Sequence, residues 1–297
     1  MGGPFGDSPA LVVTATDGVA LAVFAVGGPA SASGPASGSA SASASGGAPL
    51  LLVHGTGSDH TTWRVLGPLL AASNPVYAMD RRGRGASGDG EAYDAGLEVA
   101  DVALAAEAVE ARHGRPIVVV GHSLGGRLGL AAAIRTSSIG GVVAYEGAPV
   151  VRPPDQAGSG AAVLADLQAA LALGDHDAVL ERFMREIAGL PETELAAFRA
   201  SSLWPVRAAT APQIVRELRA ARTDPAIGFE RLAAVAVPVL QVMGAASAAP
   251  FRDGVARLHD RLAAGRLLAL PGARHNGHHT HAAALAEAVA GFAETVD

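Results

Sequence analysis

Residues 121–126, GHSLGG, place a serine between small residues where the chain must turn sharply. The apolar run 116–120 before it is typical of a buried strand, and residues 124–135 after it are typical of a helix. A serine on a tight strand-to-helix turn has its hydroxyl lifted clear of the sheet. The pattern predicts that Ser123 is a nucleophile and that the amide of Leu124, at a helix N-terminus, stabilises an oxyanion. The competing interpretation is an ordinary glycine-rich turn.

A serine nucleophile needs a base that removes its proton and later protonates the leaving group near neutral pH. Among the ten histidines of the chain, His275 follows the last apolar run, 266–270, and is separated from it by a Pro-Gly turn. We therefore expect His275 to be the base.

Residues 275–281, HNGHHTH, also raise the question of a metal site. Zinc binds neutral imidazoles, but the tract has no carboxylate, and its spacing fits neither a helical His-x-x-x-His pair nor a finger. We expect no metal and no cofactor. His278, His279 and His281 are then expected to be solvated or to start a helix near the site.

The rest of the chain predicts an α/β protein. Two apolar runs, 11–15 and 19–26, flank an Asp-Gly pair, which indicates an opening hairpin. From residue 49, short apolar runs alternate with helical patterns, which is typical of parallel βαβ units. The expected strands are 49–53, 75–79, 116–120, 139–144, 237–242 and 266–270. The expected helices are 95–112, 124–135, 253–263 and 280–293.

Two segments depart from this alternation. Residues 27–47 are a Ser/Ala/Gly tract without large apolar side chains, which we interpret as a flexible surface insertion. The alternative is a linker between two domains, but the roughly 26 residues of hairpin before the tract are too few to form a domain. Residues 151–232 are expected to form several helices and no strand. The predicted organisation is a core of residues 1–150 and 233–297 with a helical cap, 151–232, inserted into it.

Three further segments, together with GHSLGG, resemble the α/β-hydrolase family. Residues 51–57, LLVHGTG, are similar to the turn that supplies the second oxyanion amide of the family, which corresponds to Thr56. Residues 79–88 are similar to the loop after the next strand, and residues 270–275, LPGARH, to the turn that carries the catalytic histidine. The resemblance implies a mostly parallel sheet of about eight strands flanked by helices, with the serine first and the histidine last in the chain. It also implies that His54 and His122 are neutral scaffold residues.

The chain departs from this family at the catalytic acid. The family usually places an aspartate a few residues beyond a glycine after the penultimate strand, and this chain has Ser247 there. Ser247 cannot carry the charge that stabilises an imidazolium. We expect Glu146, one strand over, to take the role, because neighbouring strand ends lie about 5 Å apart and a glutamate is long enough. Asp253, another carboxylate or a serine–histidine dyad stay open as alternatives, and Glu146 could instead form a salt bridge.

The resemblance favours a serine hydrolase that acts through an acyl-enzyme on an ester, thioester or lactone of a small organic molecule. The alternatives are the non-hydrolytic proteins that share the fold without a cofactor, namely perhydrolases, lyases, cyclases and ligand-binding proteins. Trp63, Trp204 and Phe229 are candidates for lining the substrate pocket, although packing in the core or cap is an equally good role for them.

The composition of the chain limits which classes of partner are expected. The chain has 297 residues, a net charge of -6 and no cysteine, and its basic residues are scattered. We expect neither nucleic acid nor an anionic membrane surface as a partner, because both require a basic stripe. With no basic-then-apolar leader and no apolar run of about 18 residues, we expect a cytoplasmic protein. The sequence carries no signal for an oligomeric state.

Overall fold

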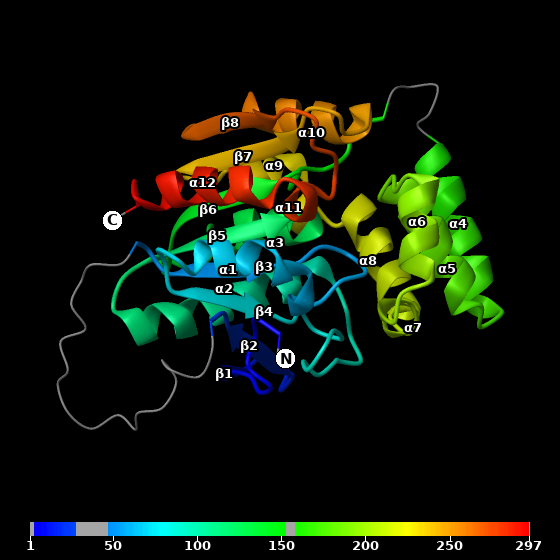
Figure 1. The fold of residues 1–297 in the computed structure, drawn as a ribbon, viewed down its shortest axis with the longest axis horizontal. Helices are drawn as coiled ribbons and strands as arrows, with labels where there is room; N and C mark the ends of the chain where they lie inside the picture. The colour runs from blue at the N-terminus through cyan, green and yellow to red at the C-terminus, as the bar shows by residue number, and fades with distance from the viewer. Residues whose placement is uncertain (1–2, 28–46, 153–157, 297) are drawn as a thin grey trace.

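A computed structural model describes residues 3–27, 47–152 and 158–296. Its centre is an eight-stranded sheet with the order β1-β2-β4-β3-β5-β6-β7-β8 (Figure 1). The strands are β1 (Leu11–Thr14), β2 (Ala20–Ala25), β3 (Leu50–Val53), β4 (Val76–Met79), β5 (Ile117–His122), β6 (Ile139–Tyr145), β7 (Val239–Gly244) and β8 (Gly265–Leu270). Each predicted strand is therefore confirmed to within a few residues. Most of the predicted insertion, 28–46, lies outside the described residues.

The first two strands differ in direction from the others. β1 and β2 form the predicted hairpin, with Gly18 at φ 85° in its turn, and β2 pairs antiparallel with β4. Every later pairing, from β4–β3 to β7–β8, is parallel. The mostly parallel sheet is thus confirmed, and its strands bring their carboxyl ends to one edge, where the turns after β3, β5, β6 and β8 meet.

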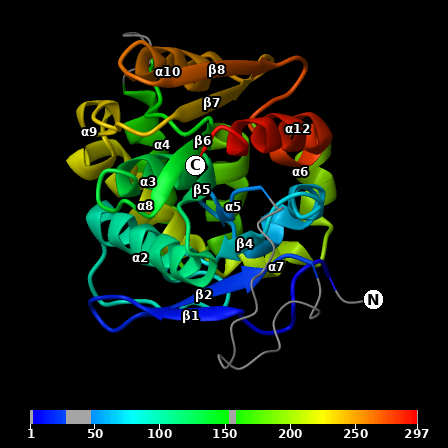
Figure 2. The same cartoon turned by 90° about the vertical axis from the view of Figure 1, so that its left-hand side faces the viewer.

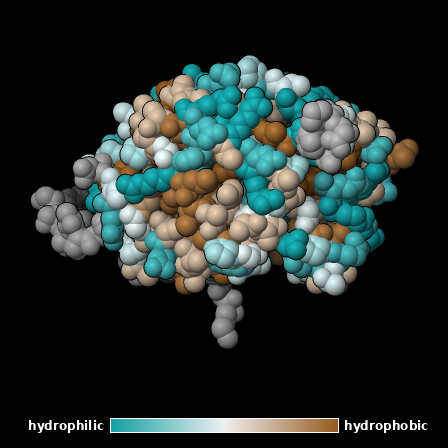
Figure 3. Space-filling view, turned by 90° about the horizontal axis from the view of Figure 1, so that it is seen from above, coloured by the Kyte–Doolittle hydropathy of each residue, from teal (hydrophilic) through white to brown (hydrophobic). Residues whose placement is uncertain are grey.

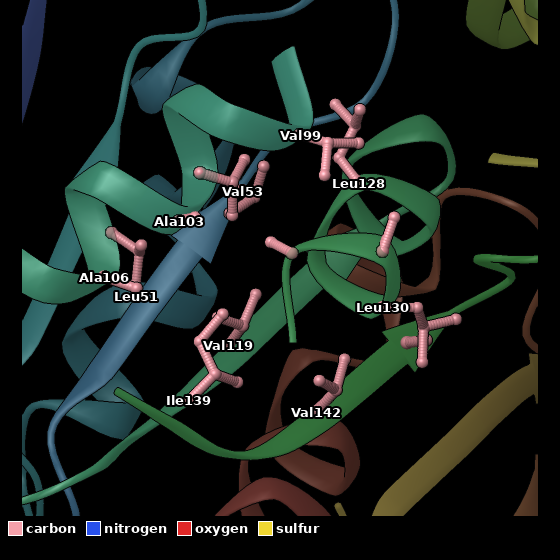
Figure 4. Packing of buried hydrophobic residues seen from close by; sticks show 14 of the residues in the cluster. Leu51, Val53, Val99, Ala103, Ala106, Val119, Leu128, Leu130, Ile139 and Val142 are labelled. Carbon is pink, nitrogen blue, oxygen red and sulfur yellow. The ribbon is translucent and has the colours of Figure 1, made fainter. Parts of the chain in front are cut away.

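Helices cover both faces of the sheet (Figure 2). One face carries α2 (Ala95–His113), α3 (Leu124–Ala132), α9 (Phe229–Ala233) and α10 (Ala249–His259). Figure 4 shows the packing on this face, where Val99 and Ala103 of α2 and Leu128 of α3 meet strand residues such as Val119. The opposite face carries α1 (Leu66–Leu70) and α12 (Ala282–Ala293). The two layers bury the central strands β3 to β7 almost completely, which explains their runs of Val, Leu and Ile, whereas the edge strands β1 and β8 are partly exposed.

Some helix boundaries differ from the predictions. α10 begins at Ala249, four residues before the expected start, because Pro250 fits the first turn of a helix, where its missing N–H costs nothing. The short helices η2 (His60–Arg64) and α1 were not predicted. Five residues with an internal proline, Pro68, carry too weak a helical pattern to recognise.

The chain between β6 and β7 contains helices and no strand in its described residues. These helices are α4 (Ser159–Ala172), α5 (His176–Arg182), η4 (Phe183–Ile187), α6 (Glu192–Arg199), α7 (Leu203–Ala208), α8 (Ala211–Thr223) and η5 (Pro225–Ile227), followed by α9. α4 to α8 share a hydrophobic cluster of their own, around Leu167, Leu180 and Ile214, and stand beside the sheet (Figure 1).

The surface mixes hydrophilic and hydrophobic residues. Figure 3 views the molecule from the side of β8 and α10 and shows a hydrophobic patch surrounded by hydrophilic residues. Among the described helices, none is both long and apolar enough to cross a membrane.

Candidate active site

Ser123 occupies a strained turn between β5 and α3. Its backbone has φ 53° and ψ −120°, a conformation that side-chain-bearing residues rarely adopt. The turn is held on both sides, because the Ser123 amide donates to the Tyr145 carbonyl (2.9 Å) and the Ser123 carbonyl accepts from the Gly126 amide (3.0 Å). A Cβ on Gly121 would lie 2.4 Å from the Gly126 Cα, so only glycine fits at that position. The strain is of the kind that fixes a side chain in one exposed orientation.

The turn after β3 packs directly against this serine. A Cβ on Gly55 would lie 3.2 Å from the Ser123 Cβ, and one on Gly125 would lie 2.2 Å from the Val53 carbonyl oxygen. This close approach brings Thr56, which follows Gly55, to the same cavity as Ser123 and Leu124. The two residues predicted to supply oxyanion amides, one in the turn after β3 and one at the start of α3, therefore line the same cavity as the serine.

His275 and Glu146 form a buried pair. The Nδ1 atom of His275 lies 2.6 Å from Oε2 of Glu146, and the glutamate side chain is fully buried. The other carboxylate oxygen of Glu146 accepts a hydrogen bond from the Gly244 amide (2.9 Å). Glu146 follows β6 directly with φ 48°, and its amide donates to Val242 in the neighbouring strand. These contacts fix the carboxylate against one ring nitrogen of His275 and leave Nε2 for another partner.

Ser247 occupies the position where the family pattern has its acid. Its hydroxyl is buried and has no hydrogen-bond partner among the described residues. A Cβ on Gly244 would lie 2.7 Å from Ser247 Oγ, which places this hydroxyl near the amide that Glu146 already occupies. One strand over, Glu146 meets the same histidine, as the spacing of strand ends suggested.

His54 and His122 make hydrogen bonds that suit neutral rings. His54 donates from Nδ1 to the Gly55 carbonyl (2.9 Å) and accepts at Nε2 from the Arg81 amide (3.2 Å). His122 donates from Nε2 to the backbone carbonyl of His275 (2.9 Å), which ties the histidine loop to the serine turn. Burial lowers the pKa of both rings well below the usual range, so neither is charged near neutral pH.

Two of the other histidines in residues 275–281 are also neutral. His278 and His279 both direct Nε2 to the Thr62 hydroxyl, at 3.1 and 3.2 Å. Burial lowers the pKa of His278 and lowers that of His279 to about 4. His281 instead pairs with Thr280 at the surface. His278 and His279 lie in the short helix α11 (Gly277–Thr280) and His281 precedes α12, so these residues start helices near the site, as one of the two expectations had it, and His278 is buried rather than solvated.

One other group of potential ligands occurs among the described residues, formed by Asp59, His60 and Asp80. The carboxylate of Asp80 already accepts hydrogen bonds from the His60 and Ala86 amides, and Asp59 is paired with Arg207. Their oxygens are thus occupied by donors within the protein, which does not suit a cation site.

A cavity of about 630 Å³ connects these groups. Ser123, His275, Thr56 and Leu124 line it on the side of the sheet, and helices between β6 and β7 line it on the other. This second side is largely apolar and includes Phe183, Met184, Ile187, Leu190 and Phe198, of which Leu190 lies in the loop before α6. The sequence analysis did not single out these residues, because their apolar pattern is the same as that of ordinary helix packing.

The three aromatic candidates for the pocket lie elsewhere. Trp63 is buried in the cluster below α12, Trp204 is buried among the helices and donates to Asp177, and Phe229 packs under Arg257. None of them is among the residues that line the cavity. Their large apolar surfaces are used for packing, which is the alternative role that the sequence allowed.

Comparison with known proteins agrees with this fold. Residues 50–288 match a family model described as the alpha/beta hydrolase family. An alpha/beta hydrolase structure from Sphaerobacter thermophilus is 27% identical with a TM-score of 0.73, and the match covers 95% of this chain and 99% of that one. No curated protein sequence matches the chain significantly.

Other solved structures show the same fold at lower identity. An esterase from Exiguobacterium antarcticum is 17% identical with a TM-score of 0.71, over 96% of this chain and 99% of that one. An enol-lactonase from Burkholderia xenovorans is 19% identical with a TM-score of 0.66, over 95% and 99% of the two chains. At these identities the likeness shows the fold alone.

Proposed function

Because this chain belongs to the alpha/beta hydrolase family, we propose that it is a serine hydrolase that cleaves an ester, thioester or lactone of a small organic molecule. The observation that supports this most directly is the 2.6 Å contact between His275 Nδ1 and Glu146, at a cavity that Ser123 also lines. A buried carboxylate on one ring nitrogen leaves the other nitrogen free to act as a base.

In the proposed mechanism, Ser123 Oγ attacks the substrate carbonyl while His275 takes its proton. The negative charge of Glu146 stabilises the imidazolium that forms. The amides of Thr56 and Leu124 stabilise the oxyanion, with Leu124 at the positive end of α3. His275 then protonates the leaving group, and a water molecule activated by the same histidine hydrolyses the acyl-enzyme.

Within the predicted cap of residues 151–232, the helices α4 to α8 form, we propose, a cap that selects the substrate, whereas η5 and α9 pack on the sheet. Two observations support a separate cap. The helices α4 to α8 share a hydrophobic cluster of their own, and they contribute most of the apolar residues that line the cavity. A cavity of about 630 Å³ is within the usual range for a small-molecule site. The solved relatives named as an esterase and an enol-lactonase are consistent with carbonyl substrates.

A fluorophosphonate probe tests the nucleophile, because it reacts covalently only with an activated serine. The purified protein should form one adduct on Ser123, and Ser123→Ala should form none while keeping the same thermal unfolding midpoint. Turnover of p-nitrophenyl butyrate should fall by roughly three orders of magnitude or more in that variant. Folded wild-type protein that neither labels nor turns over any ester or thioester would point to the non-hydrolytic proteins of this fold instead.

A further inference from the structure

Six arginines of the described chain line the active-site cavity, and three of them, from three different elements, lie close to one another. Arg127 lies on α3 one turn after Ser123, Arg152 follows β6, and Arg222 is in the last turn of α8. Arg127 is buried, Arg152 is half-buried and Arg222 is exposed, so the cost of burying an unpaired cation applies to Arg127. Two carboxylates, Glu186 and Glu194, also line the cavity.

The three side chains converge on one part of the cavity. Arg127 donates from Nη2 to the Ala221 carbonyl (2.9 Å), which is the residue before Arg222. A Cβ built on Gly160 would lie 2.6 Å from Arg222 Nη1 and 3.1 Å from Arg152 Nε, so these two guanidinium groups face the same point. The three guanidinium groups therefore lie on the same side of the cavity.

Among the described residues, no carboxylate forms an ion pair with any of these three arginines. Arg127 donates only to the backbone carbonyls of Ala221 and Ile227, and Arg152 reaches the Ser159 hydroxyl at 3.5 Å. Arg207 on the same cavity, in contrast, is paired with Asp59 at 2.7 Å.

The carboxylate that faces Arg127 most closely is already engaged elsewhere. Burial lowers the pKa of Arg127, and the charge of Asp224 opposes this in part, although the oxygens of Asp224 accept hydrogen bonds from the Ala95 and Ala226 amides. Burial lowers the pKa of Arg127 to about 10, so the group stays protonated near neutral pH. The cluster is thus a set of cations that a bound anion would stabilise.

From this arrangement we propose that the substrate carries a carboxylate, bound by Arg127, Arg152 and Arg222, at the far end of the molecule from the bond that Ser123 attacks. The inference rests on the proposed function and adds a substrate class to it. Ala148, Val150, Leu164 and Leu218 also line the cavity and suit the carbon skeleton between the two ends. Guanidinium groups bind carboxylates through two parallel hydrogen bonds, which favours arginine here.

Matched pairs of esters test this proposal. The mono-p-nitrophenyl esters of glutaric and adipic acid are compared with the same molecules capped as methyl esters, and 4-acetoxybenzoate with its methyl ester. The glutarate and adipate esters place the carboxylate on the acyl side of the bond that is cleaved, and 4-acetoxybenzoate places it on the alcohol side. In at least one pair, kcat/KM should favour the carboxylate by about tenfold or more, since a hydrogen bond to a charged group is worth that factor.

The double variant Arg152→Gln/Arg222→Gln should reduce this preference to about threefold or less, and raising the salt concentration should reduce it in the wild type. Arg219→Gln is the matched control, because Arg219 is exposed on the same helix and does not line the cavity. That control should keep the preference. Equal kcat/KM within every pair, or a preference that the double variant retains, would overturn the proposal.

A binding measurement separates this result from the proposed function. Calorimetric titration of Ser123→Ala with monomethyl glutarate should show binding that dimethyl glutarate lacks and that the added double substitution removes. If wild-type protein hydrolyses neutral esters and the Ser123→Ala titrations show no such difference, only the substrate inference fails. If no ester is hydrolysed but the anion binds, the proposed function fails and the arginine site stands.

Discussion

At the scale of single residues, the chemistry depends on where one carboxylate lies. Glu146 follows β6, the strand that pairs with β7. One of its carboxylate oxygens contacts the His275 ring, and the other accepts a hydrogen bond from the Gly244 amide. The amide of Gly244 holds the carboxylate in place at the end of β7. The extra methylene of glutamate spans the distance that the change of strand creates.

We expect Glu146→Gln to lower kcat for p-nitrophenyl butyrate by roughly 100-fold or more, because the amide keeps the shape but cannot stabilise the imidazolium. KM should change little. Steady-state kinetics checks this, with Glu230→Gln, on the exposed side of α9, as a control that keeps wild-type rates.

Ser247 offers a second test of the same role. Adding Ser247→Asp to the Glu146→Gln variant returns a carboxylate to the loop after β7, and part of the lost kcat should return with it. Wild-type kcat in Glu146→Gln itself would assign the role to another group.

At the scale of elements, the site depends on how closely three turns approach one another. Gly125 in the serine turn and Gly55 in the turn after β3 face each other's main chain. A Cβ on either residue would meet a backbone oxygen of the opposite segment. Such contacts are with main chain, which cannot move aside as a flexible side chain does. Gly125 is the tightest of these positions.

We expect Gly125→Ala to destabilise the protein by about 1–3 kcal/mol or more and to abolish labelling of Ser123, because its Cβ would lie 2.2 Å from the Val53 oxygen. Gly291→Ala on α12 is the matched control. It has no atom within 4 Å of the new Cβ, so it should stabilise the protein by up to about 1 kcal/mol. Urea unfolding measures both effects. A neutral Gly125→Ala would mean that the turns can separate without loss.

At the scale of the whole molecule, a buried ionic cluster joins the helical region to the sheet. Glu217 on α8 lies 2.7 Å from Arg81 and also contacts Arg84, both in the loop after β4, and Glu98 of α2 lies 3.4 Å from Arg81. All four side chains are at most 1% exposed. Two cations and two carboxylates balance one another, so removing one leaves an uncompensated buried charge.

Glu217→Gln should therefore destabilise the folded protein by about 3–5 kcal/mol, since both arginines lose their shared partner. Asp166→Asn provides the contrast, because its pair with Arg182 is exposed at the surface and is worth about 0–1 kcal/mol. Chemical denaturation followed by circular dichroism compares the two. Similar small losses for both variants would contradict a role of the cluster in joining the two parts.

Stability should also decline on mild acidification. Burial holds the pKa of His54, His122 and His278 below the ordinary value and that of His279 at about 4, so the unfolded chain binds more protons below about pH 6.5. The free energy of unfolding is then highest near neutral pH and falls between about pH 6.5 and 4, by at most about 1.4 kcal/mol per pH unit for each histidine.

Urea unfolding at pH 7, 6 and 5 measures this slope. His279→Gln removes one titrating group and should make the slope shallower by at most about 1.4 kcal/mol per pH unit. Gln168→Ala on α4, which removes no titrating group, is the control and should leave the slope nearly unchanged. A flat profile in the wild type would contradict the neutral state of these rings.

The sequence by itself determined the strands, most of the helices and the identity of the candidate nucleophile and base. This was possible because those features are local. Unbroken apolar runs predict buried strands, and the glycines around Ser123 predict a tight turn wherever the chain places it.

Only the tertiary structure decided how distant residues meet. It brought Glu146 against His275, gathered Arg127, Arg152 and Arg222 on one wall, and used Trp63, Trp204 and Phe229 for packing. A sequence pattern records which face of an element is apolar, but it does not record which other element covers that face. Partners of this kind depend on the order of strands in the sheet and on the docking of helices, both of which are set by packing between segments far apart in the chain.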